Sequence, residues 1–178
     1  MNIKLNNVRA AFCNIFEART VNGEGDPAYS CSFILPPGHP AEKMIRDSME
    51  TLGKDKWGAK WPALKKEMEA KDRTALHDGE TKGSYAGFAG NLYVSARSKT
   101  RPLVIDRDKT PLTAQDGKPY SGSYVNATVE IWCQDNSFGR RINASLRGIQ
   151  FARDGEPFAG GSSANPEDFE AIQEDSLV

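Results

Sequence analysis

The 178-residue sequence predicts a mainly β domain, built as a small barrel with a helical insertion between strands and a flexible acidic C-terminal tail. Three observations support this prediction. Most apolar residues alternate with polar ones at the two-residue period of half-buried strands. One stretch changes to helix-forming residues. The last 25 residues contain seven acidic residues and no lysine or arginine, so their composition differs from that of the rest of the chain.

The first two predicted strands lie on either side of a turn. Residues Val8 to Ala18 alternate in polarity, and Asn22 to Pro27 have turn chemistry. In the second strand, Ala28 to Leu35, the core face is expected to carry Tyr29, Cys31, Phe33 and Leu35. Ile34 then belongs to the opposite face. The proline-rich run that follows ends this strand.

A helical insertion is predicted at about residues 40–72. Its first helix is expected from Ala41 to Leu52, with Gly53 as the C-terminal cap. The second helix begins near Pro62, which suits a first helical turn. The lysines of this region could contact phosphates, but a solvated helix face is the simpler interpretation. Two tryptophans of the insertion are expected to pack inside the protein, Trp57 and Trp61.

Residues 77–90 are glycine-rich and are interpreted as a flexible loop that carries Tyr85 and Phe88. Strand character returns at Asn91–Ser98, where one face carries Tyr93, Ser95 and Arg97. A short strand, Pro102–Asp106, and a loop of turn residues follow.

Residues Ser123 to Phe151 are predicted to form a long β-hairpin with a bulge at Gly148. A turn centred on Asp135–Phe138 would place Trp132 opposite Arg141, and Asn126 opposite Arg147. This register keeps the polar residues of both arms on one face. The core face is expected to carry Val125, Ala127, Val129, Ile131, Cys133, Ile142, Ala144 and Leu146.

The exposed face of this hairpin combines aromatic rings with arginines. Rings on a sheet suit stacking with unpaired bases, and arginines neutralise phosphates. Because duplex DNA hides its base faces, this combination favours a single-stranded nucleic acid and an OB-fold-like barrel. The alternative is that the rings are covered and the arginines are ordinary surface charges. The candidate DNA-binding residues are Tyr124, Trp132, Arg141, Arg147, Tyr93, Arg97, Tyr85, Phe88, Lys99, Arg101 and Arg140.

Charge is distributed unevenly along the chain. The total is −1, but residues 1–153 carry +6 and residues 154–178 carry −7. A basic body with an acidic tail is typical of a protein that binds a polyanion and whose tail competes with it or recruits partners. The alternative is that the tail only keeps the protein in solution.

In two segments, Lys118–Gly161 (KPYSGSYVNATVEIWCQDNSFGRRINASLRGIQFARDGEPFAGG) and more loosely Leu5–Ala18 (LNNVRAAFCNIFEA), the sequence resembles a family of tailed-phage proteins. That family was once labelled a domain of unknown function, and its characterised members are phage single-stranded DNA-binding proteins. The resemblance implies an OB fold, sequence-independent binding of single-stranded DNA in replication or recombination, and an acidic C-terminal tail that contacts other replication proteins.

The predicted DNA-binding domain spans residues 1–153, and the predicted tail spans residues 154–178 and is disordered. The tail offers acidic and apolar side chains to phage or host replication proteins, and it is also expected to shield the basic DNA surface. Deleting it should therefore tighten DNA binding at low salt. The tail residues expected to bind partners are Glu167, Asp168, Phe169, Glu170, Glu174, Asp175, Leu177 and Val178.

Other function classes have less support. No run approaches the roughly 20 apolar residues of a membrane span, and no signal peptide is evident, so a cytoplasmic location is expected. The resemblance to phage proteins implies that this is the cytoplasm of a bacterial host. Cys13, Cys31 and Cys133 are expected to be buried thiols, because their spacing suits neither a disulfide framework nor a zinc site. No cofactor, metal or enzymatic activity is expected. The sequence permits a homo-oligomer without requiring one.

Two alternatives remain open at this stage. A metal-dependent nuclease or another DNA-processing enzyme could use Asp106 and Asp108, although the sequence IDRDKT reads more simply as a turn. A structural assembly protein is the third possibility, and it predicts no salt-sensitive DNA binding.

Overall fold

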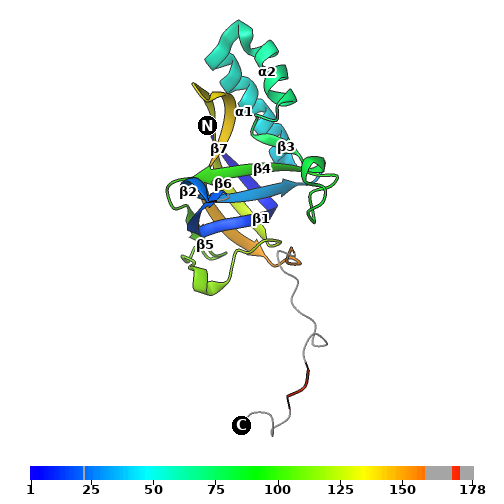
Figure 1. The fold of residues 1–178 in the computed structure, drawn as a ribbon, viewed down its shortest axis with the longest axis vertical. Coiled ribbons are helices and arrows are strands. Elements are labelled where there is room, and N and C mark those ends of the chain that lie inside the picture. Colours follow the sequence, from blue (N-terminus) through cyan, green and yellow to red (C-terminus); the bar gives the residue numbers. More distant parts are fainter. Residues whose placement is uncertain (22, 159–169, 173–178) are drawn as a thin grey trace.

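The computed structural model describes residues 1–21, 23–158 and 170–172. Within them, seven strands form one sheet in the order β3-β4-β2-β1-β6-β7-β5. A parallel pairing between Arg97 of β4 and Ser145 of β7 closes five of these strands into a barrel (Figure 1). The predicted mainly β, OB-fold-like barrel is confirmed. The strand bounds are β1 Asn2–Val21, β2 Glu24–Leu35, β3 Leu76–Asp78, β4 Leu92–Ser98, β5 Leu103–Ile105, β6 Tyr124–Asn136 and β7 Gly139–Arg153.

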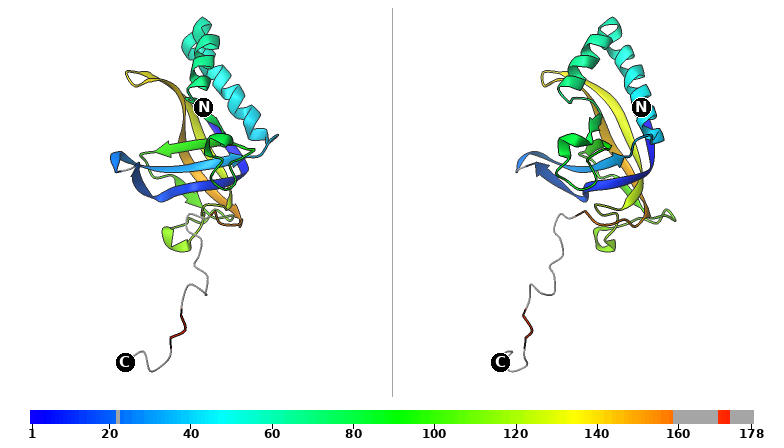
Figure 2. Two further views of the ribbon diagram at one scale, coloured as in Figure 1. Left: turned by 45° about the vertical axis from the view of Figure 1, so that its right-hand side comes forward. Right: turned by 90° about the vertical axis from the view of Figure 1, so that its right-hand side faces the viewer.

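The helices lie between β2 and β3 in the chain and at one end of the barrel (Figure 1). They comprise α1 (Pro40–Trp57), the short 3-10 helix η1 (Gly58–Lys60) and α2 (Trp61–Ala70). The predicted insertion between strands is therefore confirmed. Beside it, the β6–β7 hairpin extends beyond the barrel (Figure 2). Two further 3-10 helices lie in loops, η2 (Gly79–Lys82) and η3 (Ala114–Asp116).

The predicted end of the first helix is wrong. Gly53 does not cap α1 but lies buried within it, and the cap is Gly58, whose φ is 54°. A Cβ atom at Gly53 would lie 2.4 Å from the ring of Trp61, so this glycine allows α1 and α2 to approach closely. Trp61 is 1% exposed and stacks on Trp57 with 5.8 Å between ring centroids. The packing role expected for both tryptophans is confirmed.

The main core fills the barrel and the space beneath α1. On β6 and β7 the alternation predicts the buried residues correctly, except that Cys133 is half-buried. The core also takes Cys31, Phe33 and Leu35 from β2, as expected, whereas Tyr29 is half-buried.

A second, smaller cluster covers the other face of β2 and β4, and it corrects two expectations. Its buried residues are Ala11, Ile34, Phe88 and Tyr93, and Phe158 packs against them. Ile34 and Tyr93, expected on an uncovered sheet face, are therefore 3% and 4% exposed. The cause is the glycine-rich segment 77–90, which is not a structureless loop. Its Gly79 passes so close to the backbone of Phe88 that a Cβ atom would lie 2.0 Å from the carbonyl oxygen.

The hairpin register differs from the predicted one by two residues between the turn and the bulge, and by three residues beyond the bulge. Trp132 pairs with Asn143, Gln134 with Arg141, and Asn126 with Gln150. The loop contains only two residues, because Asn136 pairs with Gly139 and its side-chain oxygen accepts the N–H of Phe138 at 2.9 Å. A shift of two residues leaves every side chain between the turn and the bulge on its predicted face. The predicted bulge lies at Gly148, where the register shifts between Thr128 and Val129.

The segment after Arg153 continues to pack on the barrel. The N–H of Phe158 donates to the carbonyl of Ser121 at 3.0 Å, and the hydroxyl of Tyr120 donates to Asp154 at 2.8 Å. The expected tail, residues 154–178, thus begins with five residues that belong to the packed domain. Of the predicted partner-binding residues, Glu170 is exposed. The others lie outside the described residues: Glu167, Asp168, Phe169, Glu174, Asp175, Leu177 and Val178.

Two cysteines that are distant in sequence meet in space. The sulfur atoms of Cys13 and Cys31 lie 3.4 Å apart on β1 and β2, and both thiols are free. Burial raises the pKa of the Cys31 thiol. Cys13 and Cys133 are only half-buried, in contrast to the expectation. In the part of the chain that the structure describes, no helix is both long enough and apolar enough to cross a membrane.

Candidate nucleic-acid interface

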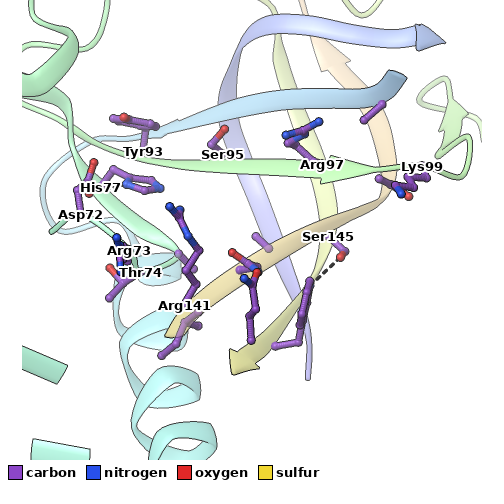
Figure 3. A pocket seen from close by; sticks show the side chains of 18 of the residues that line it. Asp72, Arg73, Thr74, His77, Tyr93, Ser95, Arg97, Lys99, Arg141 and Ser145 are labelled. Atoms are coloured by element: carbon purple, nitrogen blue, oxygen red, sulfur yellow. Dashed lines mark hydrogen bonds and ion pairs between the residues drawn. The ribbon is translucent and has the colours of Figure 1, made fainter. Parts of the chain in front are cut away.

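A groove of about 750 Å³ runs along the line where β4 meets β7. One wall is β4 and the segment that leads from α2 into β3, and the other is the β6–β7 hairpin (Figure 3). Five basic side chains and one carboxylate line it: Arg73, Lys82, Arg97, Lys99, Arg141 and Asp72. The groove is therefore strongly cationic.

The two-residue alternation of β-strands directs these side chains into the groove. On β4, Tyr93, Ser95 and Arg97 follow at two-residue spacing along one wall, as Figure 3 shows. On β7, Arg141 and Ser145 occupy the corresponding positions opposite. Since Arg97 pairs with Ser145 at the point of barrel closure, the two polar rows face the same groove.

The basic side chains of the groove differ in whether a carboxylate pairs with them. Among the described residues, Arg73, Arg97 and Arg141 have no carboxylate within ion-pairing distance. Lys99 pairs with Asp26 at 2.9 Å, but both side chains are exposed, and the hydrogen bond from Lys99 lowers the pKa of Asp26. An exposed pair of this kind contributes little and leaves Lys99 able to exchange partners. At neutral pH the groove suits an anionic polymer.

Aromatic rings supply the second component of the groove. Trp132 is 38% exposed, and its Nε1–H donates to Ser145 Oγ at 2.9 Å, which fixes the ring orientation. Across the groove, His77 stacks on Tyr93 with 4.9 Å between centroids. A half-exposed indole held by a hydrogen bond can stack with an unpaired base at little cost in conformational entropy.

The structure brings five of the predicted DNA-binding residues together in this groove. They are Tyr93, Arg97, Lys99, Trp132 and Arg141. The expectation that Tyr93 projects from the sheet as a free ring is wrong, because its ring packs between His77 and Phe88. Trp132 is thus the exposed ring among these five.

The other predicted residues lie outside the groove lining, and most are engaged elsewhere. Arg147 pairs with Glu130 at 2.6 Å, and Arg140 with Asp135 at 3.6 Å. Arg101 lies 6.0 Å from the ring of Tyr29. The ring of Tyr124 lies under the guanidinium of Arg153 at 3.7 Å, so it is not an open stacking surface. Tyr85 and Phe88 belong to a neighbouring hollow, where Phe88 is 1% exposed.

The groove residues that sequence reasoning missed include Arg73, His77 and Lys82. Arg73 lies there because its carbonyl accepts the N–H of Ile142 at 3.0 Å, which joins the end of the helical insertion to β7. No sequence signal predicts this contact between positions 69 residues apart. Nothing in the sequence singles out His77, because it does not have metal-ligand spacing to a cysteine or to another histidine.

The two carboxylates of the nuclease alternative stabilise a turn. Asp106 accepts the N–H of Arg107 at 2.8 Å and pairs with Lys118 at 3.0 Å, and these two interactions lower its pKa. Asp108 accepts the N–H of Thr110 at 3.0 Å. The part of the chain that the structure describes contains no group of three or more His, Cys, Asp or Glu placed to hold a metal. Nothing here supports a nuclease.

Comparisons with a family model, a related sequence and solved structures all find phage proteins. The model of the family described as Enterobacter phage Enc34, ssDNA-binding protein, matches residues 1–178. Putative protein p50 of Acyrthosiphon pisum secondary endosymbiont phage 1 is 47% identical in a 178-residue alignment, and the match covers 97% of this chain and 94% of the relative. The single-stranded DNA-binding protein from bacteriophage Enc34, solved in complex with ssDNA, has a TM-score of 0.75 and 25% identity over 89% of each chain. The single-stranded DNA-binding protein gp2.5 of bacteriophage T7 shares the fold, with a TM-score of 0.60 and 12% identity over 92% of this chain and 98% of gp2.5.

Proposed function

The chain belongs to the family of the Enterobacter phage Enc34 single-stranded DNA-binding protein, and from this premise we propose that it binds single-stranded DNA, without sequence preference, in the groove between β4 and β7. The observation that carries this proposal is the groove itself. It combines three arginines without ion-pair partners among the described residues and one exposed indole. Phosphates and unpaired bases are the ligands that such a surface recognises.

Each component has a separate role in binding. Arg97 and Arg141, on opposite walls, neutralise phosphates and release condensed counterions, which makes the affinity depend on salt. Trp132 stacks on a base, an interaction worth about 1 to 3 kcal/mol, and it tolerates any base because every base has a π-face. Paired bases in a duplex do not expose that face, so the groove prefers single strands.

The biological role follows from this activity and from the family. The protein coats exposed single strands during phage DNA replication or recombination in the host cytoplasm, and it acts without catalysing a reaction. Its acidic C-terminal tail recruits replication proteins and competes with DNA for the basic groove. The charge difference between body and tail supports this role, since +6 and −7 attract each other at low salt.

Titration of the intrinsic tryptophan fluorescence with oligo-dT tests the proposal at two salt concentrations, with duplex DNA as the comparison. Three variants sharpen the test. Trp132→Phe keeps a ring but removes this fluorophore, so the quenching should largely disappear while binding persists. Trp132→Ala should weaken binding about 5- to 150-fold, as measured by the anisotropy of labelled DNA. Trp57→Phe is the control, because this ring stacks on Trp61 outside the groove.

The outcomes separate the candidate functions. Strong quenching by oligo-dT that weakens with salt and is nearly absent with duplex DNA is the expected result. Equal binding of both forms would contradict the stacking argument, because it would show a surface that reads phosphates alone. Absence of binding to either form would refute the proposal and favour an assembly role.

A further inference from the structure

A second hollow, of about 670 Å³, lies beside the groove. Its lining is largely aromatic, and two of its rings are open to solvent: Phe12 is 40% exposed and Tyr85 is 54% exposed. The two rings meet edge to face, with 5.1 Å between centroids. Exposed aromatic rings gathered around a concavity are typical of a binding site rather than of an ordinary surface. We propose that this hollow is a second base-binding subsite for the same DNA strand.

A distortion in the backbone of β1 places the ring of Phe12 in this hollow. Phe12 has a φ of 50°, a conformation that bulky residues rarely adopt. It lies in a bulge, where the pairing of β1 with β2 shifts register between Ala11 and Asn14. Ala10 faces the main core, so regular alternation would send Phe12 into that core as well. The bulge turns the ring outward instead, which is typical of a bulge at a functional site.

A single lysine connects the hollow to the groove. Lys82 lines the groove, and its Nζ lies 5.0 Å from the ring centroid of Phe12 and 5.3 Å from that of Tyr93. The rings of Tyr93 and Phe88 form a continuous wall between the two sites, with 5.2 Å between centroids. A strand that leaves the groove at this end therefore meets Lys82 first and the two exposed rings next.

This geometry suits both the phosphate and the base of a nucleotide. The ammonium of Lys82 can bind the phosphate, and the adjacent base can stack on Tyr85 or Phe12. The hollow is continuous with the interface that the proposed function assigns, and this inference rests on that function. Its consequence is that a strand long enough to reach past Lys82 gains an additional stacked base.

The test compares the full chain with Tyr85→Ala and Tyr85→Phe. Their affinities are measured by anisotropy for oligo-dT of increasing length at fixed salt. Tyr85→Ala should bind the shortest oligonucleotides as the parent chain does, and lose about tenfold in affinity once the strand is long enough to enter the hollow. Tyr85→Phe keeps the ring and should match the parent at every length. Because Tyr85 is exposed, neither change should alter the thermal unfolding midpoint.

A fluorescent base placed at successive positions of a long oligonucleotide supplies the second measurement. Stacking on the ring should quench 2-aminopurine near one end of the bound strand, and Tyr85→Ala should relieve quenching at that position while leaving the groove positions unchanged. Equal affinities of Tyr85→Ala and the parent at all lengths would overturn the inference but not the proposed function. An equal loss at every length, the shortest included, would also overturn it, because Tyr85 would then act within the groove. If the parent bound no oligonucleotide, the proposed function and this inference would fall together.

Discussion

Arginine side chains that look equivalent in the sequence differ in what surrounds them. Arg97 and Arg147 lie on exposed strand positions and were both candidates for DNA binding. In the folded chain Arg97 lines the groove, whereas Arg147 lies outside its lining and donates two hydrogen bonds to Glu130, at 3.1 and 2.6 Å. The two arginines therefore form a matched pair for measuring how much an arginine without a carboxylate partner contributes to DNA binding.

We predict that Arg97→Ala weakens binding to oligo-dT and lowers the slope of log affinity against log salt by about 0.7, the value for one phosphate contact on a single strand. Arg147→Ala should leave that slope unchanged. Anisotropy titrations at four or more salt concentrations measure both slopes. A slope that stays constant in Arg97→Ala, or that falls equally in the two variants, would contradict the assignment of phosphate contacts to the groove.

Gly53 is a second residue whose role depends on its neighbours. Replacing a glycine within a helix by alanine usually gains about 1 kcal/mol. Here the new Cβ atom would lie 2.4 to 2.5 Å from three ring atoms of Trp61, which is itself buried and stacked. We therefore predict that Gly53→Ala destabilises the fold by about 1 to 3 kcal/mol in urea unfolding. Asp55→Ala, at an exposed position of the same helix, should change stability by less than about 0.5 kcal/mol. Greater stability of Gly53→Ala would show that the two helices separate easily.

At the level of single residues, the period of two predicted most of the core of β6 and β7. It did not predict the burial of Ile34 and Tyr93, because a strand pattern describes the strand and not what covers it. A layer formed by residues 84–88 and Phe158 buries the face that the pattern left exposed. Exposure of an aromatic ring on a sheet is therefore the part of the site that sequence reasoning predicts least well.

At the level of elements, the hairpin shows what the sequence determines and what it leaves open. The polarity of each arm defines the faces, and Gly148 correctly marked the bulge. Loop length sets the register, and four polar or aromatic residues in a row are compatible with either a four-residue or a two-residue loop. The hydrogen bond from the N–H of Phe138 to the side-chain oxygen of Asn136 stabilises the two-residue loop. Trp132 consequently faces Asn143, and it donates to Ser145.

A side-chain hydrogen bond between Trp57 and Asp135 also links the helical insertion to this hairpin. The Nε1–H of Trp57 donates to Asp135 Oδ2 at 2.9 Å, and Arg140 lies 3.6 Å from the same oxygen. The hydrogen bond from Trp57 is the main cause that lowers the pKa of Asp135. A carboxyl whose pKa is lower in the folded chain than in the unfolded one stabilises the fold above its unfolded pKa. That stabilisation is lost as the pH falls through the folded pKa.

We predict that Asp135→Asn, which removes the charge and keeps the shape, is less stable than the parent at pH 7. The difference should shrink as the pH falls below about 4, the ordinary range of an aspartate, and should vanish below the folded pKa. Urea unfolding at several pH values measures it, and comparing the two chains cancels the titration of all other carboxyls. A difference that does not change with pH would show that the charge of Asp135 contributes nothing to the link.

At the level of the whole molecule, the groove exists because distant segments meet. Its walls come from β4, β7 and the segment after α2, and the pairing of Arg97 with Ser145 closes the barrel. Local patterns carry no information on this closure. The sequence therefore predicted the barrel class and five residues of the groove, but not Arg73 or Lys82. The same limit applies to the tail boundary, because the contacts of residues 154–158 are made with β1 and with the loop before β6.

The charge distribution leads to the last prediction. Residues 1–158 carry +4 and residues 159–178 carry −5, so the last 20 residues can compete with DNA for the groove. The deletion that tests this competition begins at residue 159, because Phe158 and the four residues before it pack on the barrel. We predict that removing residues 159–178 tightens the binding of oligo-dT at low salt, and that the difference fades as the Debye length shortens to about 8 Å at physiological ionic strength.

A full-length control separates charge from bulk in this experiment. In it, Glu167, Glu170 and Glu174 become glutamine, and Asp168 and Asp175 become asparagine. If the tail competes through its charge, this neutral tail should tighten binding as much as the deletion does. If only the deletion tightens binding, the tail obstructs the groove sterically. Unchanged or weaker binding in both chains would contradict the competition, and the acidic tail would then have to act through other proteins alone.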